Sequence, residues 1–498
     1  MNPKRLYGSL SICKRSLPHN LPSELLSYIF SIATDCCEER YEAILTPITM
    51  SHVCSRWREV AISAGGLWTK FSLTFPTYRG QLSRTMTWLS RSRTYPIDIL
   101  LDFRDPLWDW DEHSHVFHWQ DMESIVRLFL THVKRWHHFE LLTDTWAPIF
   151  TFLWYTRGVE SAPLLRSISL SRCNAYFASK GEIFQPVELK EPIPLFGGLT
   201  LNKLRDVSLS GVHVDWARSS LRDLTKLELR YLASDVIPSK DEFIDILAGC
   251  SDLRHLSITG WGPRFDKVPI PGSTSGNEDV PKESRRTIQP IQLRHLLSFS
   301  LGFVDVNYAL KLLSLFSFPS IETLALEDVS FSLNPFERQD ATPILDWLAP
   351  IHESSDSSKR LSHTRHGFLG SIISLQLHGI HSNESAFSNF FLALPSLQHL
   401  GVTGIPDNAL HALAPHPSSE TTSHRYPCPA LRKLDCRNVD CTILVDVVRS
   451  RGQAIGVSPL DAVSFDSSSD NAHHPTPADR LKLNEAGIKV LCGPTEIS

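Results

Sequence analysis

A nine-residue pattern of apolar and polar positions recurs along most of the chain. Each copy is apolar at its first, fourth, sixth and ninth positions. The copy LTKLELRYL, which starts at Leu224, alternates Leu227 and Leu229 with charged residues. Because successive strand side chains point to opposite faces, the pattern predicts a short strand with one buried face. Nine copies begin at Leu165, Leu204, Leu224, Leu253, Leu296, Ile321, Ile372, Leu397 and Leu431, and looser versions begin at Trp136 and Leu460.

Segments with helical periodicity lie between these predicted strands. Apolar residues spaced at i, i+3 and i+4 predict helices around 243–247, 310–316, 387–394 and 443–448. One strand and one helix cannot bury their apolar faces alone. Stacked units can, with the strands side by side in a parallel sheet and the helices behind it.

This pattern resembles the leucine-rich repeat, whose consensus is L-x-x-L-x-L-x-x-N/C-x-L with a period of 20–29 residues. The resemblance covers roughly residues 130–495, but it is imperfect in two respects. Successive copies start 20 to 51 residues apart, and the ninth position, Asn or Cys in the consensus, is a cysteine only at Cys173 and another apolar residue, such as Val212, in the other copies. The resemblance implies an irregular solenoid with insertions. The alternative is a generic α/β protein in which the nine-residue pattern occurs by chance. We expect flexible loops at 263–290, 353–366, 415–429 and 466–479, which are rich in Pro, Ser, His and charged residues.

Two further apolar stripes lie near the N-terminus. The first lies in LPSELLSYIFSIAT, residues 21–34, where Asn20 and Pro22 suit the start of a helix. The second lies in residues 53–61, which Ser51 can cap and Gly65-Gly66 can end. Two or three short helices in about 50 residues cannot form a self-sufficient core. Their apolar faces must therefore dock on the rest of the chain or on another protein.

These stripes resemble the F-box, a three-helix module, and with the later Leu-Trp pair they are similar to a large fungal set of F-box proteins. The stretch from Thr34 to Thr49 is longer than is usual in that family. The matching residues are Leu21, Pro22, Glu24, Leu25, Leu26, Ile29 and Phe30, then Val53, Cys54, Trp57 and Arg58, then Leu67 and Trp68.

The resemblance implies a function. F-box proteins bind a Skp1-type adaptor, which connects to cullin and RING subunits, and their C-terminal repeats present a protein substrate for ubiquitin transfer. It therefore implies an adaptor-binding patch, some members of which must instead face the module's own interior. The candidate residues are Leu21, Pro22, Leu25, Ile29, Phe30, Val53, Cys54 and Trp57.

The expected fold is α/β. A helical F-box-like module occupies residues 15–75, a junction of mixed strands and helices 76–160, and an irregular leucine-rich-repeat-like solenoid with a parallel sheet 161–498. The expected function is that of a substrate receptor of a Skp1-cullin-F-box type ubiquitin ligase. The alternative is a non-catalytic scaffold whose F-box-like helices only cap the solenoid. Exposure of the 21–30 patch favours the first, and its burial against residues 76–160 favours the second.

Length, composition and charge exclude several other classes. The 498 residues exceed what one compact core usually holds, which favours several domains or a repeat architecture. A net charge of −5 provides no basic excess for nucleic acid. The sequence contains no run of about 18 apolar residues, so we expect no membrane span. The first 20 residues are too interrupted for a secretory signal, and the ten cysteines are sparse, so we expect the cytosol or the nucleus.

Candidate chemistry is scarce. The glycine-rich phosphate-binding motifs and H-E-x-x-H do not occur, so we expect neither an enzyme nor a cofactor. One His- and Asp-rich stretch could bind zinc by donor type, but a solvated loop is the simpler interpretation because no second part of a site is evident: Asp109, Asp111, His113, His115 and His118. Six tryptophans are expected to pack the junction, with interface hot spots as the alternative: Trp108, Trp110, Trp119, Trp136, Trp146 and Trp154.

Overall fold

The structure is a computed structural model. It describes residues 21–37, 40–77, 79–112, 114–172, 182–265, 290–319, 321–333, 338–350, 367–415, 426–437, 439, 441–454, 456–465, 481, 483 and 489–492. Most of the four expected loop insertions, and residues 15–20 of the expected module, lie outside these ranges.

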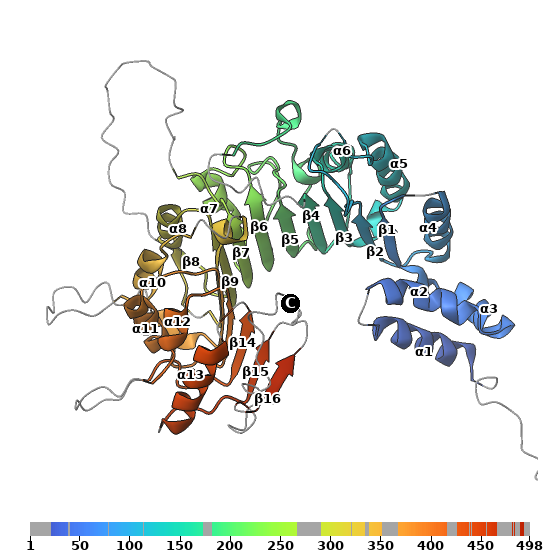
Figure 1. The fold of residues 1–498 in the computed structure, drawn as a ribbon. Helices are drawn as coiled ribbons and strands as arrows, with labels where there is room; N and C mark the ends of the chain where they lie inside the picture. Colours follow the sequence, from blue (N-terminus) through green and yellow to red (C-terminus); the bar gives the residue numbers. More distant parts are fainter. Residues whose placement is uncertain are drawn as a thin grey trace, which may run out of the picture.

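One parallel sheet runs through the described chain and curves into an arc (Figure 1). It has 14 strands, and their order across the sheet is their order along the chain. A separate parallel pair joins β8 (Ile291–Gln292) and β10 (Phe316–Ser317). The strands of the large sheet are β1 (Lys70–Thr74), β2 (Ile97–Asp102), β3 (Trp136–Thr143), β4 (Ser167–Arg172), β5 (Asp206–Ser210), β6 (Lys226–Leu232), β7 (His255–Gly260), β9 (Ser298–Phe303), β11 (Thr323–Asp328), β12 (Ser374–His378), β13 (His399–Thr403), β14 (Lys433–Arg437), β15 (Ala462–Phe465) and β16 (Lys489–Cys492).

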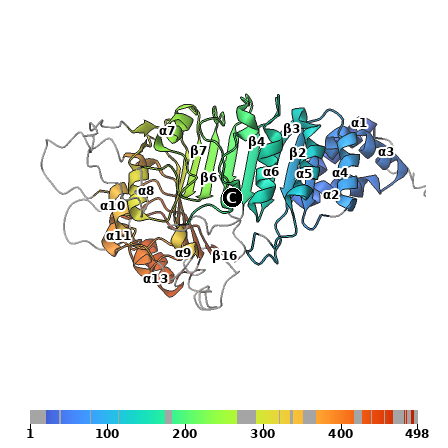
Figure 2. The ribbon, with the colours of Figure 1, turned by 90° about the horizontal axis from the view of Figure 1, so that it is seen from above.

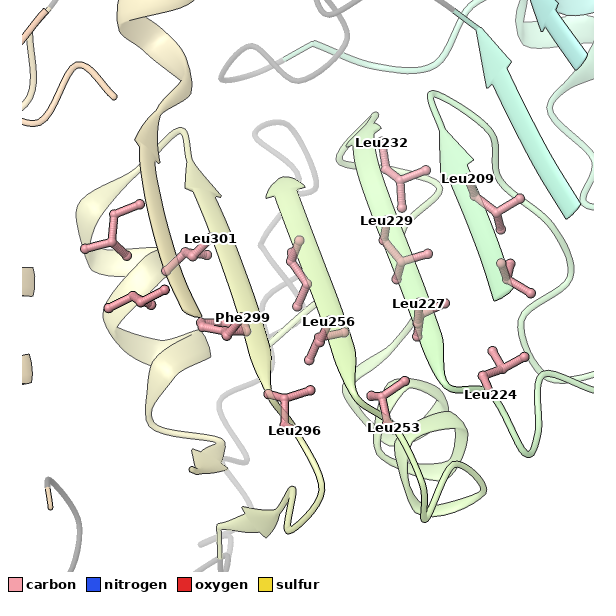
Figure 3. Close-up of a cluster of buried hydrophobic side chains, with 14 of the residues drawn as sticks. Leu209, Leu224, Leu227, Leu229, Leu232, Leu253, Leu256, Leu296, Phe299 and Leu301 are labelled. Carbon is pink, nitrogen blue, oxygen red and sulfur yellow. The ribbon is translucent and has the colours of Figure 1, made fainter. Parts of the chain in front are cut away.

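The nine-residue pattern forms the sheet as predicted. In the copy at Leu224, the apolar Leu227 and Leu229 are buried, and they stack in register with equivalent residues of neighbouring strands. Leu227 pairs with Val207 on one side. On the other side it pairs with Leu256 (Figure 3). All nine predicted copies contain a strand of the large sheet, so the prediction of a parallel α/β architecture is confirmed.

Helices cover the outer side of the arc, and the sheet lines its inner side (Figures 1 and 2). Each predicted helical segment contains a helix, although the helix around 310–316 ends at Leu313 and Phe316 belongs to β10 instead. Several helices begin at a side-chain cap: Ser239 and Glu242 form a reciprocal capping box, and Asp305 accepts a hydrogen bond from the Tyr308 N–H. The helices after the N-terminal region are α4 (Arg79–Arg91), α5 (Trp119–Leu130), α6 (Trp146–Thr156), α7 (Lys240–Ala248), α8 (Val306–Leu313), α9 (Val329–Leu333), α10 (Thr342–Leu348), α11 (Glu384–Leu392), α12 (Asp407–His411) and α13 (Cys441–Gln453).

Three helices precede the sheet: α1 (Ser23–Asp35), α2 (Arg40–Ser51) and α3 (Ser55–Ser63), followed by the 3-10 turn η2 (Gly65–Trp68). We call residues 21–68 the helical module. The sheet begins directly after it at Lys70, within the residues expected to belong to the F-box-like module. Strands β1, β2 and β3, all before the expected start of the solenoid at 161, pair in order with β4. Within the described ranges, no helix has the length and apolar character needed to cross a bilayer.

Candidate protein-docking surface

The helical module has its own interior, which continues into the core of the sheet. Leu26 and Phe30 of α1 are buried with Ile44 of α2 and Val60 of α3. At the boundary with the sheet, the indole N–H of Trp68 donates to the Ala61 carbonyl at 2.8 Å. The Trp68 ring also lies 5.5 Å from the Trp88 ring of α4. The shared core fixes the module to the first strands of the sheet.

One face of α1 remains exposed. Leu25, Tyr28, Ile29 and Ile32 have exposed fractions of 51, 64, 45 and 45%. Their i, i+3, i+4 and i+7 spacing places them on one side of the helix. We call these four residues the α1 stripe. Scattered exposed apolar residues are ordinary, but four on one helix face indicate a surface that contacts something else.

The start of α3 lies beside the start of α1. A guanidinium N–H of Arg56 donates to the Leu21 carbonyl, which joins the two helix ends. Val53, two residues before α3, is exposed, and so is Ile62 within α3. Cys54 is the N-cap residue of α3, and its Sγ accepts a hydrogen bond from the Trp57 N–H at 3.4 Å. The segment between α2 and α3 therefore adds apolar surface at the end of the module where α1 begins.

The structure divides the eight candidate residues into three groups. Pro22, Leu25, Ile29 and Val53 are exposed. Leu21, Cys54 and Trp57 are half-buried. Phe30 is fully buried, so it is a core residue and cannot contact a partner, which corrects its place in the candidate patch.

Sequence reasoning missed three exposed residues, Tyr28, Ile32 and Ile62. A signal existed for the first two, because they extend the helical spacing that begins at Leu25. The two apolar stripes locate only the first and last helices of the expected three-helix module; α2, which contains Pro47, lies mostly in the long stretch from Thr34 to Thr49. Helix α1 begins with Pro22 as its N-cap residue, while Asn20 lies outside the described residues.

The inner face of the sheet presents a second, polar surface. On β6, opposite the buried leucines, Lys226 Nζ lies 3.0 Å from Glu228 Oε1, and an Arg230 guanidinium nitrogen lies 3.4 Å from the same oxygen. The Ser208 hydroxyl of β5 donates to Glu228 at 2.8 Å. Burial raises the pKa of Glu228, but Arg230, Ser208 and Lys226 outweigh it and lower that pKa below its ordinary value. At neutral pH, Glu228 is therefore ionised and paired with the cations of Lys226 and Arg230 on the same strand.

A similar arrangement recurs near the other end of the sheet. Asp435 of β14 pairs with His399 of β13, and Lys433 Nζ lies 3.3 Å from Asp435 Oδ2. Burial raises the pKa of Asp435, but hydrogen bonds from His399 and Ser464 lower it to about 2. The inner face thus offers fixed charges and hydroxyls, a suitable lining for contact with a hydrophilic protein surface.

The His- and Asp-rich stretch does not gather its side chains. His115 is buried, and its Nε2 lies 3.1 Å from Asp144 Oδ2. Asp109 instead accepts a hydrogen bond from the Ser114 hydroxyl at 2.5 Å, and His113 lies outside the described residues. In the part of the chain that is described, the residues of this stretch form no metal-ligand cluster.

The tryptophan prediction is correct only in part. Trp136 and Trp146 are buried in the core as expected. Trp110, Trp119 and Trp154 are exposed, which corrects the expectation that they pack the junction. Composition distinguishes the groups only in part: Trp110 and Trp119 lie in or beside the His- and Asp-rich stretch, whereas the exposed Trp154 lies in the same apolar helix as the buried Trp146.

Comparison with known proteins adds no assignment. The chain matches no model of a known protein family, and no match is found among curated proteins. Its function must therefore be inferred from its own residues and their geometry.

Proposed function

We propose that this chain is the substrate-recognition subunit of a Skp1-cullin-F-box type ubiquitin ligase. Its helical module docks on a Skp1-type adaptor, and the inner face of its sheet receives a protein substrate. The observation that carries the proposal is the exposed α1 stripe: Leu25, Tyr28, Ile29 and Ile32 lie on one helix face that the rest of the described chain leaves uncovered. The alternative, a helical cap closing the end of a scaffold, instead predicts that this face is buried against the neighbouring strands.

The architecture supports a docking subunit. The helical module stands at one end of the arc, and the sheet continues away from it (Figure 1). Because the module and the sheet share one core through Trp68 and Phe71, an adaptor bound at one end would hold the inner face in a fixed direction. A substrate receptor needs such a rigid link between its two binding surfaces.

The sequence resemblances agree with this division of roles. Residues 21–30 and 53–58 carry the F-box-like positions, and the strands carry the leucine-rich-repeat-like phrase. In this proposal the chain itself performs no chemistry and needs no cofactor. It acts in the cytosol or the nucleus, where adaptor and cullin subunits meet it.

The test is a binding assay between the full chain and a purified Skp1-type adaptor. The Leu25→Asp/Ile29→Asp variant places two charges on the α1 stripe, and Met86→Asp places one on the exposed face of α4. Because removing apolar anchors from an interface costs several kcal/mol, we expect the first variant to lose about 100-fold or more in affinity. We expect Met86→Asp to bind like the wild type.

Circular dichroism of each variant serves as the folding control. Equal binding by the wild type and the stripe variant would contradict the proposed contact. No binding by the wild type would contradict the ligase role and leave the scaffold interpretation in its place.

A further inference from the structure

The second strand pair of the sheet contains a β-bulge that turns two consecutive histidines to one side. Ile97 of β2 pairs with Trp136 of β3, but the next residue, Asp98, pairs with His138, so His137 is an extra residue in β3. In a regular strand, two neighbouring side chains point to opposite faces. Here both histidines are half-buried between the buried Trp136 and Phe139. Bulges re-aim side chains in this way.

The bulge brings both imidazoles to the carboxylate of Asp98. His137 Nδ1 lies 3.2 Å from Asp98 Oδ1, and the two imidazole ring centroids lie 4.1 Å apart. The possible ligand atoms of all three residues lie within 4.8 Å of one another. Two donors bound to zinc at about 2.0–2.1 Å in a tetrahedron lie about 3.3 Å apart. The Asp98–His137 pair already has this separation, and a possible ligand atom of His138 lies within 4.8 Å of both.

Neighbouring contacts fix the backbone of the three candidate ligands. The Asp98 backbone N–H donates to the Thr69 carbonyl at 2.9 Å, which ties this residue to β1. The Phe139 ring stacks on the Trp136 ring with 4.9 Å between centroids, which fixes β3 on both sides of the histidines.

A cavity of about 320 Å³ opens beside the cluster. Asp98, His138 and Glu140 line it on the sheet, and Ile44 lines it from α2 of the helical module. Coordination positions that the protein does not fill would face this space. The site therefore lies where the module meets the inner face of the sheet.

We propose that Asp98, His137 and His138 bind a divalent transition-metal ion of the zinc class, with the remaining coordination positions open to the cavity. Two imidazoles and a carboxylate are the donor set that such ions prefer over the all-oxygen sites of magnesium and calcium. This inference does not depend on the proposed adaptor role, because the α1 stripe takes no part in it.

The test uses the full chain, stripped with a chelator, dialysed and titrated with ZnCl₂ by calorimetry. We expect one ion per chain at this site and an affinity loss of about tenfold or more in Asp98→Asn and in His137→Gln/His138→Gln. The other adjacent histidine pair in the sequence provides the matched control, and His473→Gln/His474→Gln should bind like the wild type.

A second measurement needs no variant. Substituting Co²⁺ for zinc in the wild-type chain should produce the visible absorption of a low-symmetry site with nitrogen and oxygen ligands. Absence of that absorption, absence of zinc binding by the wild type, or equal zinc binding by the wild type and folded Asp98→Asn would each overturn the proposal. Loss of adaptor binding in a separate assay would leave it standing.

Discussion

The Phe30 ring of α1 lies 4.9 Å from the Trp57 ring of α3, with an angle of 57° between the ring planes. This contact joins the first and third helices of the module through its interior. The residue just before Phe30, Ile29, points to the exposed face of the same helix. Two neighbouring apolar residues of α1 thus serve different surfaces, one internal and one external.

The pair Phe30→Ala and Ile29→Ala should separate these roles. Removing a fully buried phenylalanine costs about 3–5 kcal/mol, because contacts with Trp57 are lost and a cavity remains. Truncating the exposed Ile29 should change the free energy of unfolding by less than about 0.5 kcal/mol and weaken adaptor binding instead. Urea unfolding of both variants measures the difference. Equal destabilisation by the two substitutions would contradict the assignment of Phe30 to the interior.

Gly211, directly after β5, should not tolerate a side chain. Its φ is +62°, and a Cβ there would lie 2.8 Å from the Arg172 carbonyl oxygen. The left-handed conformation alone costs a non-glycine residue about 1–2 kcal/mol, and the close approach to backbone adds to it. We expect Gly211→Ala to lower the free energy of unfolding by about 2 kcal/mol or more. Gly158→Ala is the control, since a Cβ at Gly158 meets nothing within 4 Å.

Arg451 of α13 is a buried cation that holds three backbone carbonyls. Its guanidinium donates to Leu413, Pro427 and Cys428 oxygens at 3.1, 2.9 and 2.7 Å. Arg451→Met keeps the apolar stem but orphans these acceptors, and each buried unsatisfied group costs about 1–3 kcal/mol. We expect a loss of at least about 2 kcal/mol in urea unfolding. The exposed Arg449, 3.4 Å from Asp446, is the matched site, and Arg449→Met should cost under about 1 kcal/mol.

The nine-residue pattern predicted the sheet because it indicates both where a strand lies and which of its faces is buried. In Leu224–Leu232, period-2 alternation is strong, and every copy has the same physical need to stack. The start of the sheet was not predicted, because β1 reads only KFSLT and its pairing with Ile97–Asp102 is a long-range choice. Local pattern reports which face of a strand is buried, not which strand lies next to it.

The candidate surfaces were harder to predict for a related reason. Apolar residues at Ile29 and Phe30 are equivalent in a sequence, and only packing against Trp57 decides which one is internal. The cluster of Asp98, His137 and His138 depends on a bulge, which leaves no reliable trace in local alternation. Sites that depend on strand register or on tertiary packing therefore cannot be predicted from the pattern of a single segment.

His213 is a buried histidine held neutral by its surroundings. Its ring stacks on the Trp146 ring at 4.8 Å with an angle of 11°, and Nε2 lies 2.9 Å from the Lys190 carbonyl oxygen. Because that oxygen only accepts, Nε2 carries the proton and donates. Burial lowers the pKa of His213 to about 4, although the hydrogen bond to the Lys190 carbonyl and the charge of Asp235 oppose this shift.

Acid should therefore destabilise the protein through His213. In the unfolded chain this histidine takes up a proton near pH 6.5, while the folded chain resists until about pH 4, so stability is full above the first value and falls as pH drops toward the second. The largest loss is about 3 kcal/mol, since each pKa unit is about 1.4 kcal/mol. His213→Phe lacks the hydrogen bond to Lys190 and should be the less stable protein at pH 7.5. It also lacks the proton uptake, so its deficit should shrink or reverse by pH 5 in urea unfolding. A deficit that stays constant from pH 7.5 to pH 5 would show that His213 protonates equally in both states.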